Sequence, residues 1–120
     1  MNKTSTKHIL VVDDDPEITR MLQIMLEHFG FEVKRAHGTA QGMTMVEHAV
    51  PDLVVLDFMM PHLSGVEMCS FIRRDPRTAH VPVVIYSAAS GDDDIQAAMA
   101  GGATRYVLKT AGSEELMKVI

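Results

Sequence analysis

Two apolar runs of the chain end in carboxylates. The run ILVV is followed by Asp13, Asp14 and Asp15, and the run LVVL is followed by Asp57. Carboxylates held close together repel one another, and burial raises their pKa values. A hard divalent cation such as Mg2+ relieves that repulsion and keeps coordination positions open for phosphate oxygens. An aspartate is also a known nucleophile for phosphoryl groups. These residues could therefore hold Mg2+ and accept a phosphoryl group.

Two later apolar runs end in residues that suit the same chemistry. VVIY is followed by Ser87, and YVL is followed by Lys109. An ammonium group stabilises the charge that develops on a transferring phosphoryl group. A hydroxyl can hydrogen-bond a phosphoryl oxygen, and the small Ala88 and Ala89 leave room for the group.

The four groups belong to a regular alternation of strand-like and helix-like segments. Apolar residues recur at steps of three and four between the strand-like runs, which indicates helices. Strict alternation predicts an α/β protein with a parallel sheet covered on both faces. The strand-like runs lie at 9–12, 31–36, 53–57, 82–87 and 105–109, and helices are expected to begin near Pro16, Thr39, Gly65, Gly91 and Ser113.

The apolar patterns also predict the order of the strands. The first, third and fourth runs are apolar without interruption, as expected for strands buried on both faces. The second run alternates, and the fifth is flanked by Arg105 and Lys109, so both suit the edges. The simplest order is 2-1-3-4-5, a doubly wound sheet. Such a sheet opens a crevice at the carboxyl ends of its strands where the order reverses, and the four groups would meet there.

Composition sets the broad class. The chain has 120 residues, 47% of them hydrophobic, and suits one domain over residues 1–120 with a loose polar tail at 1–7. The net charge is -5 with no basic run, which argues against direct nucleic-acid binding. No apolar stretch is long enough to cross a membrane. The single Cys69 fits a reducing compartment, so we expect a cytoplasmic protein.

Four sequence elements together resemble the receiver domain of two-component response regulators. They are VVDDDP (11–16), LVVLDFMMPHLSG (53–65), VVIYSA (83–88) and YVLK (106–109). Each one alone is a weak signal, but their order and spacing together are very specific. The resemblance covers essentially the whole chain and implies a flavodoxin-like fold similar to that of chemotaxis regulators.

The resemblance implies a role for each acidic residue. Asp57 corresponds to the phospho-acceptor, and Asp13 and Asp14 correspond to the acidic pair that holds Mg2+, with Asp14 as a direct ligand. Asp57 itself and the backbone carbonyl of Met59 would complete the protein's metal ligands. Asp15 lies outside this pattern and is expected to cap the helix that begins at Pro16.

The resemblance also implies a switch. Lys109 would contact the phosphoryl group, Ser87 would be the switch hydroxyl, and Tyr106 would be the aromatic residue that rotates behind it. The phosphoryl group would come from a sensor histidine kinase, a phosphotransfer protein or a small phosphodonor. The fourth helix, fifth strand and fifth helix would then change shape and control a partner, a second copy or a C-terminal output domain.

Such a domain is no enzyme in the ordinary sense, because it catalyses only its own phosphoryl transfer and dephosphorylation. The last helix is expected to be cut off at Ile120, within a longer protein. One departure stands out: the family usually has a cis proline after the lysine, where this chain has Thr110. A non-proline cis bond costs about 2.5–4 kcal/mol, so this loop is either trans and reshaped, or strained.

Three other functions compete with this hypothesis. A degenerate receiver would bind partners without phosphorylation, and only Thr110 favours it. A haloacid-dehalogenase-like phosphatase normally has a second aspartate two residues after the nucleophile, where this chain has Met59. A nucleotide-binding protein would need a G-x-G-x-x-G or Walker motif after the first strand, and neither is present.

Overall fold

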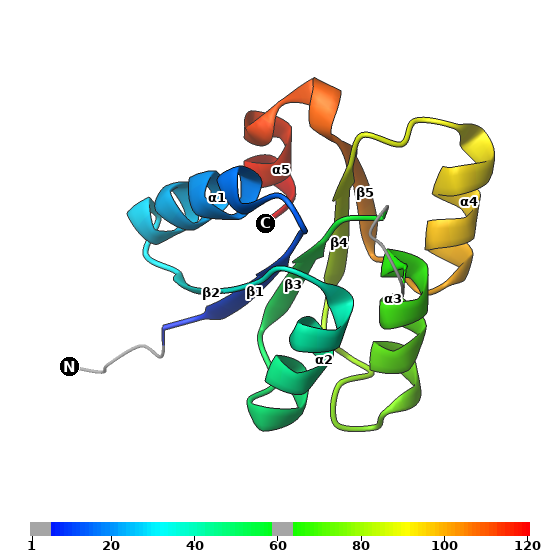
Figure 1. Cartoon of the computed structure of the whole chain (residues 1–120), viewed down its shortest axis with the longest axis horizontal. Helices are drawn as coiled ribbons and strands as arrows, with labels where there is room; N and C mark the ends of the chain where they lie inside the picture. The colour runs from blue at the N-terminus through cyan, green and yellow to red at the C-terminus, as the bar shows by residue number, and fades with distance from the viewer. Residues whose placement is uncertain (1–5, 59–63) are drawn as a thin grey trace.

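A five-stranded parallel sheet forms the centre of the molecule (Figure 1). The computed structural model describes residues 6–58 and 64–120. The strand order is β2-β1-β3-β4-β5, as the sequence predicts. The strands are β1 (His8–Val12), β2 (Glu32–Ala36), β3 (Leu53–Leu56), β4 (Val83–Ser87) and β5 (Arg105–Leu108).

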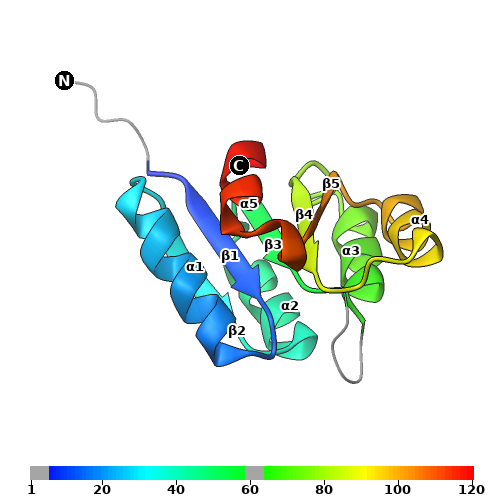
Figure 2. The same ribbon diagram turned by 90° about the horizontal axis from the view of Figure 1, so that it is seen from above.

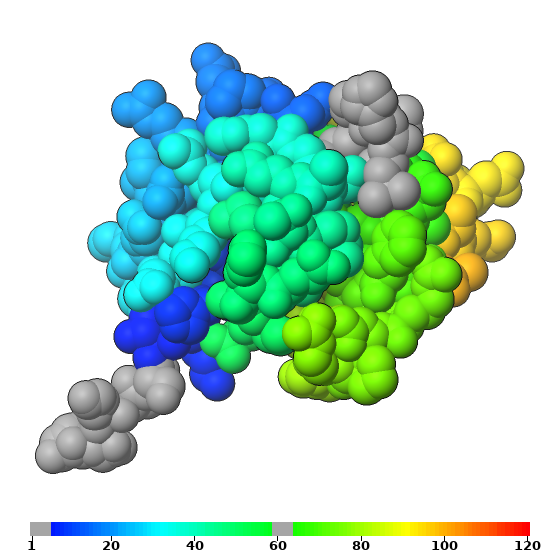
Figure 3. All heavy atoms as spheres, turned by 60° about the horizontal axis from the view of Figure 1, so that its bottom comes forward, coloured from blue at the N-terminus to red at the C-terminus, as the bar shows by residue number. Residues whose placement is uncertain are grey.

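Five α-helices cover the two faces of this sheet, which confirms the predicted doubly wound α/β class. They are α1 (Pro16–His28), α2 (Thr39–His48), α3 (Gly65–Arg74), α4 (Asp92–Ala100) and α5 (Ser113–Val119), with a 3-10 turn, η1 (Lys109–Ala111), before α5. Figure 2 shows α1 and α5 on the same side of the strands. Figure 3 shows α2 and α3 side by side on the opposite face.

The side chains of β1 illustrate how one strand supplies both cores. Ile9 and Val11 point to one face, where they pack with Leu22 and Leu26 of α1. Leu10 and Val12 point to the other face and belong to the core formed with α2, α3 and α4. Successive strand side chains point to opposite faces, so a strand between two helical layers must be apolar at every position.

The two edge strands differ from the centre in the predicted way. In β2 only Val33 and Ala36 are buried, whereas all five residues of β4 are buried. The fifth strand ends one residue earlier than expected, at Leu108, because Lys109 begins the 3-10 turn. No helix among residues 6–58 and 64–120 is long and apolar enough to cross a membrane.

Candidate functional site

Three carboxylates meet at the carboxyl ends of two adjacent strands. Asp13 and Asp14 follow β1 and Asp57 follows β3, and these strands pair in parallel register, Val12 opposite Leu56. One carboxylate oxygen from each of the three aspartates lies within 4.8 Å of the others. Asp13 and Asp57 are only 3% and 7% exposed, whereas Asp14 is exposed to solvent. The predicted acidic cluster therefore forms, with two members buried and one facing water.

Lys109 joins this cluster from the first position after β5, a strand that lies two places away from β3 in the sheet. Its Nζ lies 2.8 Å from Oδ2 of Asp13 and 3.5 Å from Oδ2 of Asp57. Burial alone would lower the pKa of Lys109, but the hydrogen bond to Asp13 and the charge of Asp57 outweigh it and raise this pKa. Lys109 is therefore a stable cation that bridges two carboxylates from different strands.

The pKa of Asp13 is raised, whereas a carboxylate whose charge is fully compensated has a lowered pKa. Burial is the largest influence and raises its pKa above the ordinary value of 3.8, although hydrogen bonds from Lys109 and from the backbone of Asp15 lower it. The negative charge of Asp57 adds to the increase. Three carboxylates and one ammonium group leave an excess of negative charge at this end of the sheet. Oxygen donors with excess negative charge suit a hard divalent cation.

Asp15 has a different task from its two neighbours. Its side chain accepts a hydrogen bond from the backbone N–H of Glu17 at 3.0 Å, and Pro16 occupies the first helical position. This is the expected N-cap of α1. The backbone N–H of Asp15 donates to Oδ1 of Asp13 at 2.9 Å, which fixes the orientation of that carboxylate. The acidic triplet thus divides into two site carboxylates and one cap.

Gly65 is a site residue whose importance the sequence did not reveal. A Cβ atom at this position would lie 2.2 Å from the backbone oxygen of Asp57. The start of α3 can therefore approach Asp57 only because residue 65 has no side chain. Ser64 and Glu67 form a reciprocal capping box that holds the helix start in this place. The short sequence SGVE indicates the start of the helix, because Ser64 can cap a helix that begins at Gly65. It does not show that Gly65 lies against the backbone of Asp57.

The proposed switch residues lie beside one another on β4 and β5. Ser87 is fully buried, and its Oγ accepts a hydrogen bond from the backbone N–H of Ala89 at 3.2 Å. The Tyr106 hydroxyl donates to the backbone oxygen of Ala89 at 2.6 Å. The Tyr106 ring also faces Phe58, with 6.4 Å between ring centroids. Phe58, which directly follows Asp57, was not among the predicted site residues and links the aspartate to the aromatic side chain.

The sequence left two forms open for the loop after Lys109, one trans and reshaped and one strained. The structure has the trans form. The bond between Lys109 and Thr110 is trans, as are the other peptide bonds of the described chain. Lys109 opens the 3-10 turn, and the N–H of Gly112 donates to the oxygen of Lys109 at 3.1 Å. The predicted metal ligand Met59 lies outside the described residues.

The chain belongs to the family of response regulator receiver domains, whose sequence model matches residues 9–120. Among characterised proteins it is similar to the DNA-binding response regulator MtrA of Mycolicibacterium smegmatis, with 37% identity over 114 residues. It is also similar to the phosphate regulon transcriptional regulatory protein PhoB of Pseudomonas aeruginosa, with 33% identity over 111 residues. These matches cover 95% and 92% of this chain but only 49% and 48% of the relatives. The chain thus spans about half the length of these relatives.

Solved structures give the same result for the fold. The chemotaxis protein CheY4 of Vibrio cholerae superimposes with a TM-score of 0.89 at 25% identity, and 96% of each chain is covered. A putative response regulator of Chloroflexus aurantiacus superimposes with a TM-score of 0.89 at 27% identity, covering 95% of this chain and 93% of that one. The identification made from the four sequence elements is therefore confirmed.

Proposed function

We propose that this domain is a phosphorylation-activated signalling switch in which Asp57 accepts the phosphoryl group. The observation that carries the proposal is the meeting of Asp13, Asp14, Asp57 and Lys109 at one end of the sheet. A carboxylate that is held close to other carboxylates and to an ammonium group is poorly explained by folding stability alone. Perturbed and clustered charges of this kind are typical of functional sites.

In the proposed reaction, a carboxylate oxygen of Asp57 attacks the phosphorus of a phosphohistidine or a small phosphodonor. The new P–O bond forms as the bond from phosphorus to the donor's leaving group breaks. Lys109 lies 3.5 Å from Asp57 and would bind an oxygen of the transferred group, offsetting its charge. The buried hydroxyl of Ser87 would hydrogen-bond another oxygen. The loss of the phosphoryl group to water would be catalysed by the same residues.

The carboxylates of Asp13, Asp14 and Asp57, with the carbonyl of Met59, would hold Mg2+. When bound, Mg2+ supplies positive charge to the phosphoryl oxygens and lowers the repulsion between donor and carboxylates. Asp14 is the exposed member of the cluster and suits the entry side of this site. Asp13 is held by Lys109 and by the backbone of Asp15, so its carboxylate is oriented before any ion binds.

The switch in this proposal runs through Ser87 and Tyr106 to the face formed by α4, β5 and α5. Ser87 would leave its bond to Ala89 for a phosphoryl oxygen, and Tyr106 would turn inward behind it. Ala98 is the only buried residue of α4, so this helix is weakly anchored and suited to move. In physical terms, a change of charge at Asp57 biases a bistable face.

The proposed partners follow from the same function. A sensor histidine kinase or phosphotransfer protein would supply the phosphoryl group. The relatives are about twice as long and are named as DNA-binding or transcriptional regulators, so a C-terminal output domain is part of the proposal. The face of α4, β5 and α5 would contact that domain or a second copy. A cytoplasmic location is also proposed, because Cys69 is a buried free thiol that suits a reducing compartment.

The direct test is the intact mass of the protein after incubation with acetyl phosphate and Mg2+. We expect one added phosphoryl group, which is absent in the Asp57→Asn variant and when EDTA replaces Mg2+. Asp93→Asn is the matched control, since Asp93 is an exposed aspartate in the first turn of α4, and it should be phosphorylated normally. An adduct that survives in Asp57→Asn would contradict Asp57 as the acceptor. The absence of any adduct would favour a phosphorylation-independent binding module.

A further inference from the structure

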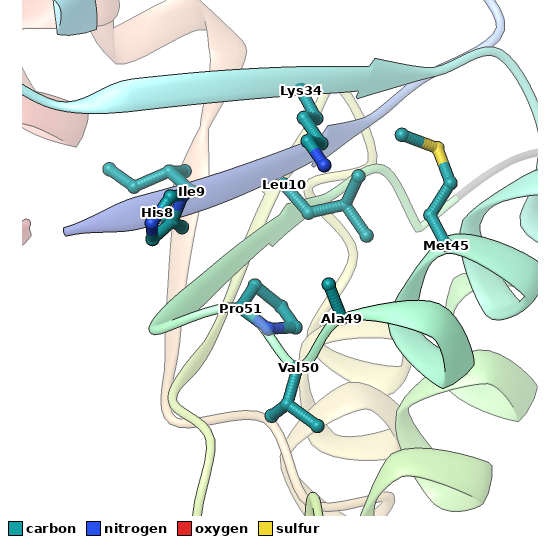
Figure 4. A pocket seen from close by; sticks show the side chains of 8 residues that line it. All are labelled: His8, Ile9, Leu10, Lys34, Met45, Ala49, Val50 and Pro51. Atoms are coloured by element: carbon teal, nitrogen blue, oxygen red, sulfur yellow. The ribbon is translucent and has the colours of Figure 1, made fainter. Parts of the chain in front are cut away.

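A pocket lies at the amino-terminal end of the sheet, opposite to the carboxylate cluster. It has a volume of about 250 Å3 and opens between β1, β2 and the end of α2 (Figure 4). The residues that line it are His8, Ile9, Leu10, Lys34, Met45, Ala49, Val50 and Pro51. None of them takes part in the proposed phosphoryl transfer.

Most of the pocket wall is apolar. Leu10 of β1 forms a floor that is only 3% exposed, and Pro51 is buried beside it, whereas the side chain of Ile9 points to the other face of the sheet. Val50 is 40% exposed, although it is a large aliphatic residue next to this floor. The side chain of Met45 borders the pocket from α2 (Figure 4). A small apolar group could displace water from these surfaces, and flexible methionine adapts well to such a group.

One cation at this pocket has no counter-charge in the described part of the chain. Lys34 lies opposite Leu10 in the β1–β2 ladder and is exposed, and no ion pair or hydrogen bond of its ammonium group occurs there. Figure 4 shows its side chain leaving β2 toward Leu10 and Met45. The other basic residue, His8, is already engaged, because its Nδ1 lies 3.2 Å from Glu32. Lys34 is therefore the group that can bind an anion.

The two ends of the pocket differ in charge. The last turn of α2 ends beside Ala49 and carries the negative end of the helix dipole. A carboxylate there would be repelled, so it must lie at the Lys34 end. The apolar body of the same ligand would then extend toward Val50 and Pro51. Charge and hydrophobicity together fix the orientation of the ligand.

We propose that this pocket binds a small amphipathic carboxylate, with the carboxylate on Lys34 and an apolar body of a few carbons over Leu10, Val50 and Pro51. The volume of about 250 Å3 is below that of typical sites for drug-sized ligands, which limits the ligand to a short chain or one ring. The proposal is independent of phosphoryl transfer at Asp57 and can fail or hold without it.

The test is a titration with hexanoate, followed by two-dimensional amide NMR of the 15N-labelled protein. We expect saturable shifts that centre on the pocket, with a dissociation constant in the millimolar range. Neutral 1-hexanol should bind two- to fivefold more weakly, the size of effect expected for an exposed charge pair. This difference should shrink as salt is added. Equal binding of hexanoate and hexanol would overturn the carboxylate assignment.

Two variants locate the binding site. Lys34→Gln should abolish the preference for hexanoate over hexanol, while Lys118→Gln, at an exposed lysine of α5, should leave it unchanged. Ala49→Phe fills the pocket from an exposed position and should abolish saturable binding of both ligands. The amide spectrum of each variant reports whether it remains folded. Unchanged binding to folded Ala49→Phe, or a preference retained in Lys34→Gln, would refute the proposal.

Discussion

Each end of the sheet holds a partly buried cation, but the two cations have different kinds of partner. At the carboxyl end, Lys109 contacts the carboxylates of Asp13 and Asp57. At the amino end, Arg73 of α3 donates four hydrogen bonds to neutral acceptors. These are the backbone oxygens of Gly102 (2.9 Å), Ala79 (3.1 Å) and Val81 (2.6 Å) and the hydroxyl of Thr104 (3.2 Å).

This difference separates a site that can change state, around Lys109, from a structural joint that cannot, which consists of Arg73 and its four hydrogen-bond acceptors. A carboxylate can take up a proton, a metal ion or a phosphoryl group, so the interaction of Lys109 with it can be altered. A backbone carbonyl has no such chemistry, and Arg73 therefore holds the loops before β4 and β5 in one arrangement. The joint fixes the loop that follows α4, whereas the helix itself is anchored only at Ala98.

Each end also depends on one glycine at a close approach. Gly65 faces the backbone oxygen of Asp57, and Gly102 faces the side chain of Arg73. A Cβ at Gly102 would lie 2.7 Å from Cγ of Arg73, and Gly102 has a φ of +109°, which side chains rarely adopt. The same residue type thus serves a chemical site in one place and a structural joint in the other.

The largest effect that would sharpen this comparison is expected for Lys109→Met. It removes the cation that offsets charge on the transferred group, so we expect phosphorylation by acetyl phosphate to slow by about 100-fold or more. The rate is read from the intact mass over time. Lys118→Met removes an exposed lysine and should keep the wild-type rate. A rate for Lys109→Met within threefold of wild type would show that Lys109 is only structural.

Arg73→Met should destabilise the fold but leave phosphorylation almost unchanged. It deprives four acceptors of their donor, and we expect a loss of about 2–4 kcal/mol in the free energy of unfolding, measured by urea denaturation. The phosphorylation rate should change less than threefold under conditions in which the variant is folded. Arg77→Met, at an exposed arginine paired with Asp75, should leave the free energy of unfolding almost unchanged. A large loss of phosphorylation in folded Arg73→Met would show that the two ends are coupled.

Gly65→Ala should affect both stability and chemistry. The added Cβ must push away the backbone of Asp57, which we expect to cost about 1–3 kcal/mol and to slow phosphorylation as well. Gly38→Ala is the control, because nothing lies within 4 Å of a Cβ built there. The prediction fails if Gly65→Ala is phosphorylated at the wild-type rate.

Gly102→Ala should affect stability alone. Its positive φ and its contact with Arg73 should cost about 1–2 kcal/mol in urea denaturation, with an unchanged phosphorylation rate. Gly38→Ala again serves as the reference. If Gly102→Ala and Gly38→Ala are equally stable, the side chain of Arg73 moves aside at no cost, and its close contact with Gly102 does not contribute to stability.

The smallest expected effect concerns Asp13→Asn and its dependence on pH. Burial raises the pKa of Asp13 in the folded state, so folding disfavours its ionised form. The associated stability is present below the unfolded pKa, near 3.8, and is lost as the pH rises through the folded pKa. With EDTA at pH 7, Asp13→Asn should therefore be the more stable protein, and its advantage should disappear near pH 3.

Mg2+ should reverse that order, because an ion that binds only the folded wild type stabilises it. Urea denaturation at both pH values, with EDTA and with Mg2+, gives the four comparisons. Asp14, which is exposed, supplies the control, since Asp14→Asn should lose Mg2+ stabilisation without gaining stability in EDTA. A less stable Asp13→Asn in EDTA at pH 7 would show that the bond to Lys109 outweighs burial.

The sequence predicted the larger part of the fold. The uninterrupted run ILVV predicted a central strand, and the alternating run at 31–36 predicted an edge, so the strand order followed. These predictions succeed because the spacing of apolar residues along a strand depends directly on whether one or two of its faces are buried. The cap formed by Asp15 was predictable for the same local reason.

The residue types of the site were also visible in the sequence, but their contacts were not. Nothing in the chain before folding shows that Lys109 lies closer to Asp13 than to Asp57, or that Phe58 faces Tyr106. The role of Gly65 depends on a backbone oxygen eight residues earlier, and that of Arg73 depends on loops far apart in the sequence. Such contacts arise only when separate elements pack together.

The sequence by itself therefore determined the family, the order of the strands and the residues that meet at their carboxyl ends. Apolar periodicity and short motifs are local properties, and parallel strands bring their ends together without further information. The tertiary structure alone decided how close Lys109 lies to each carboxylate, how deeply Asp13 is buried, and which glycines permit close approaches to Asp57 and Arg73. Those properties depend on distances between elements, and packing sets them to within a fraction of an ångström.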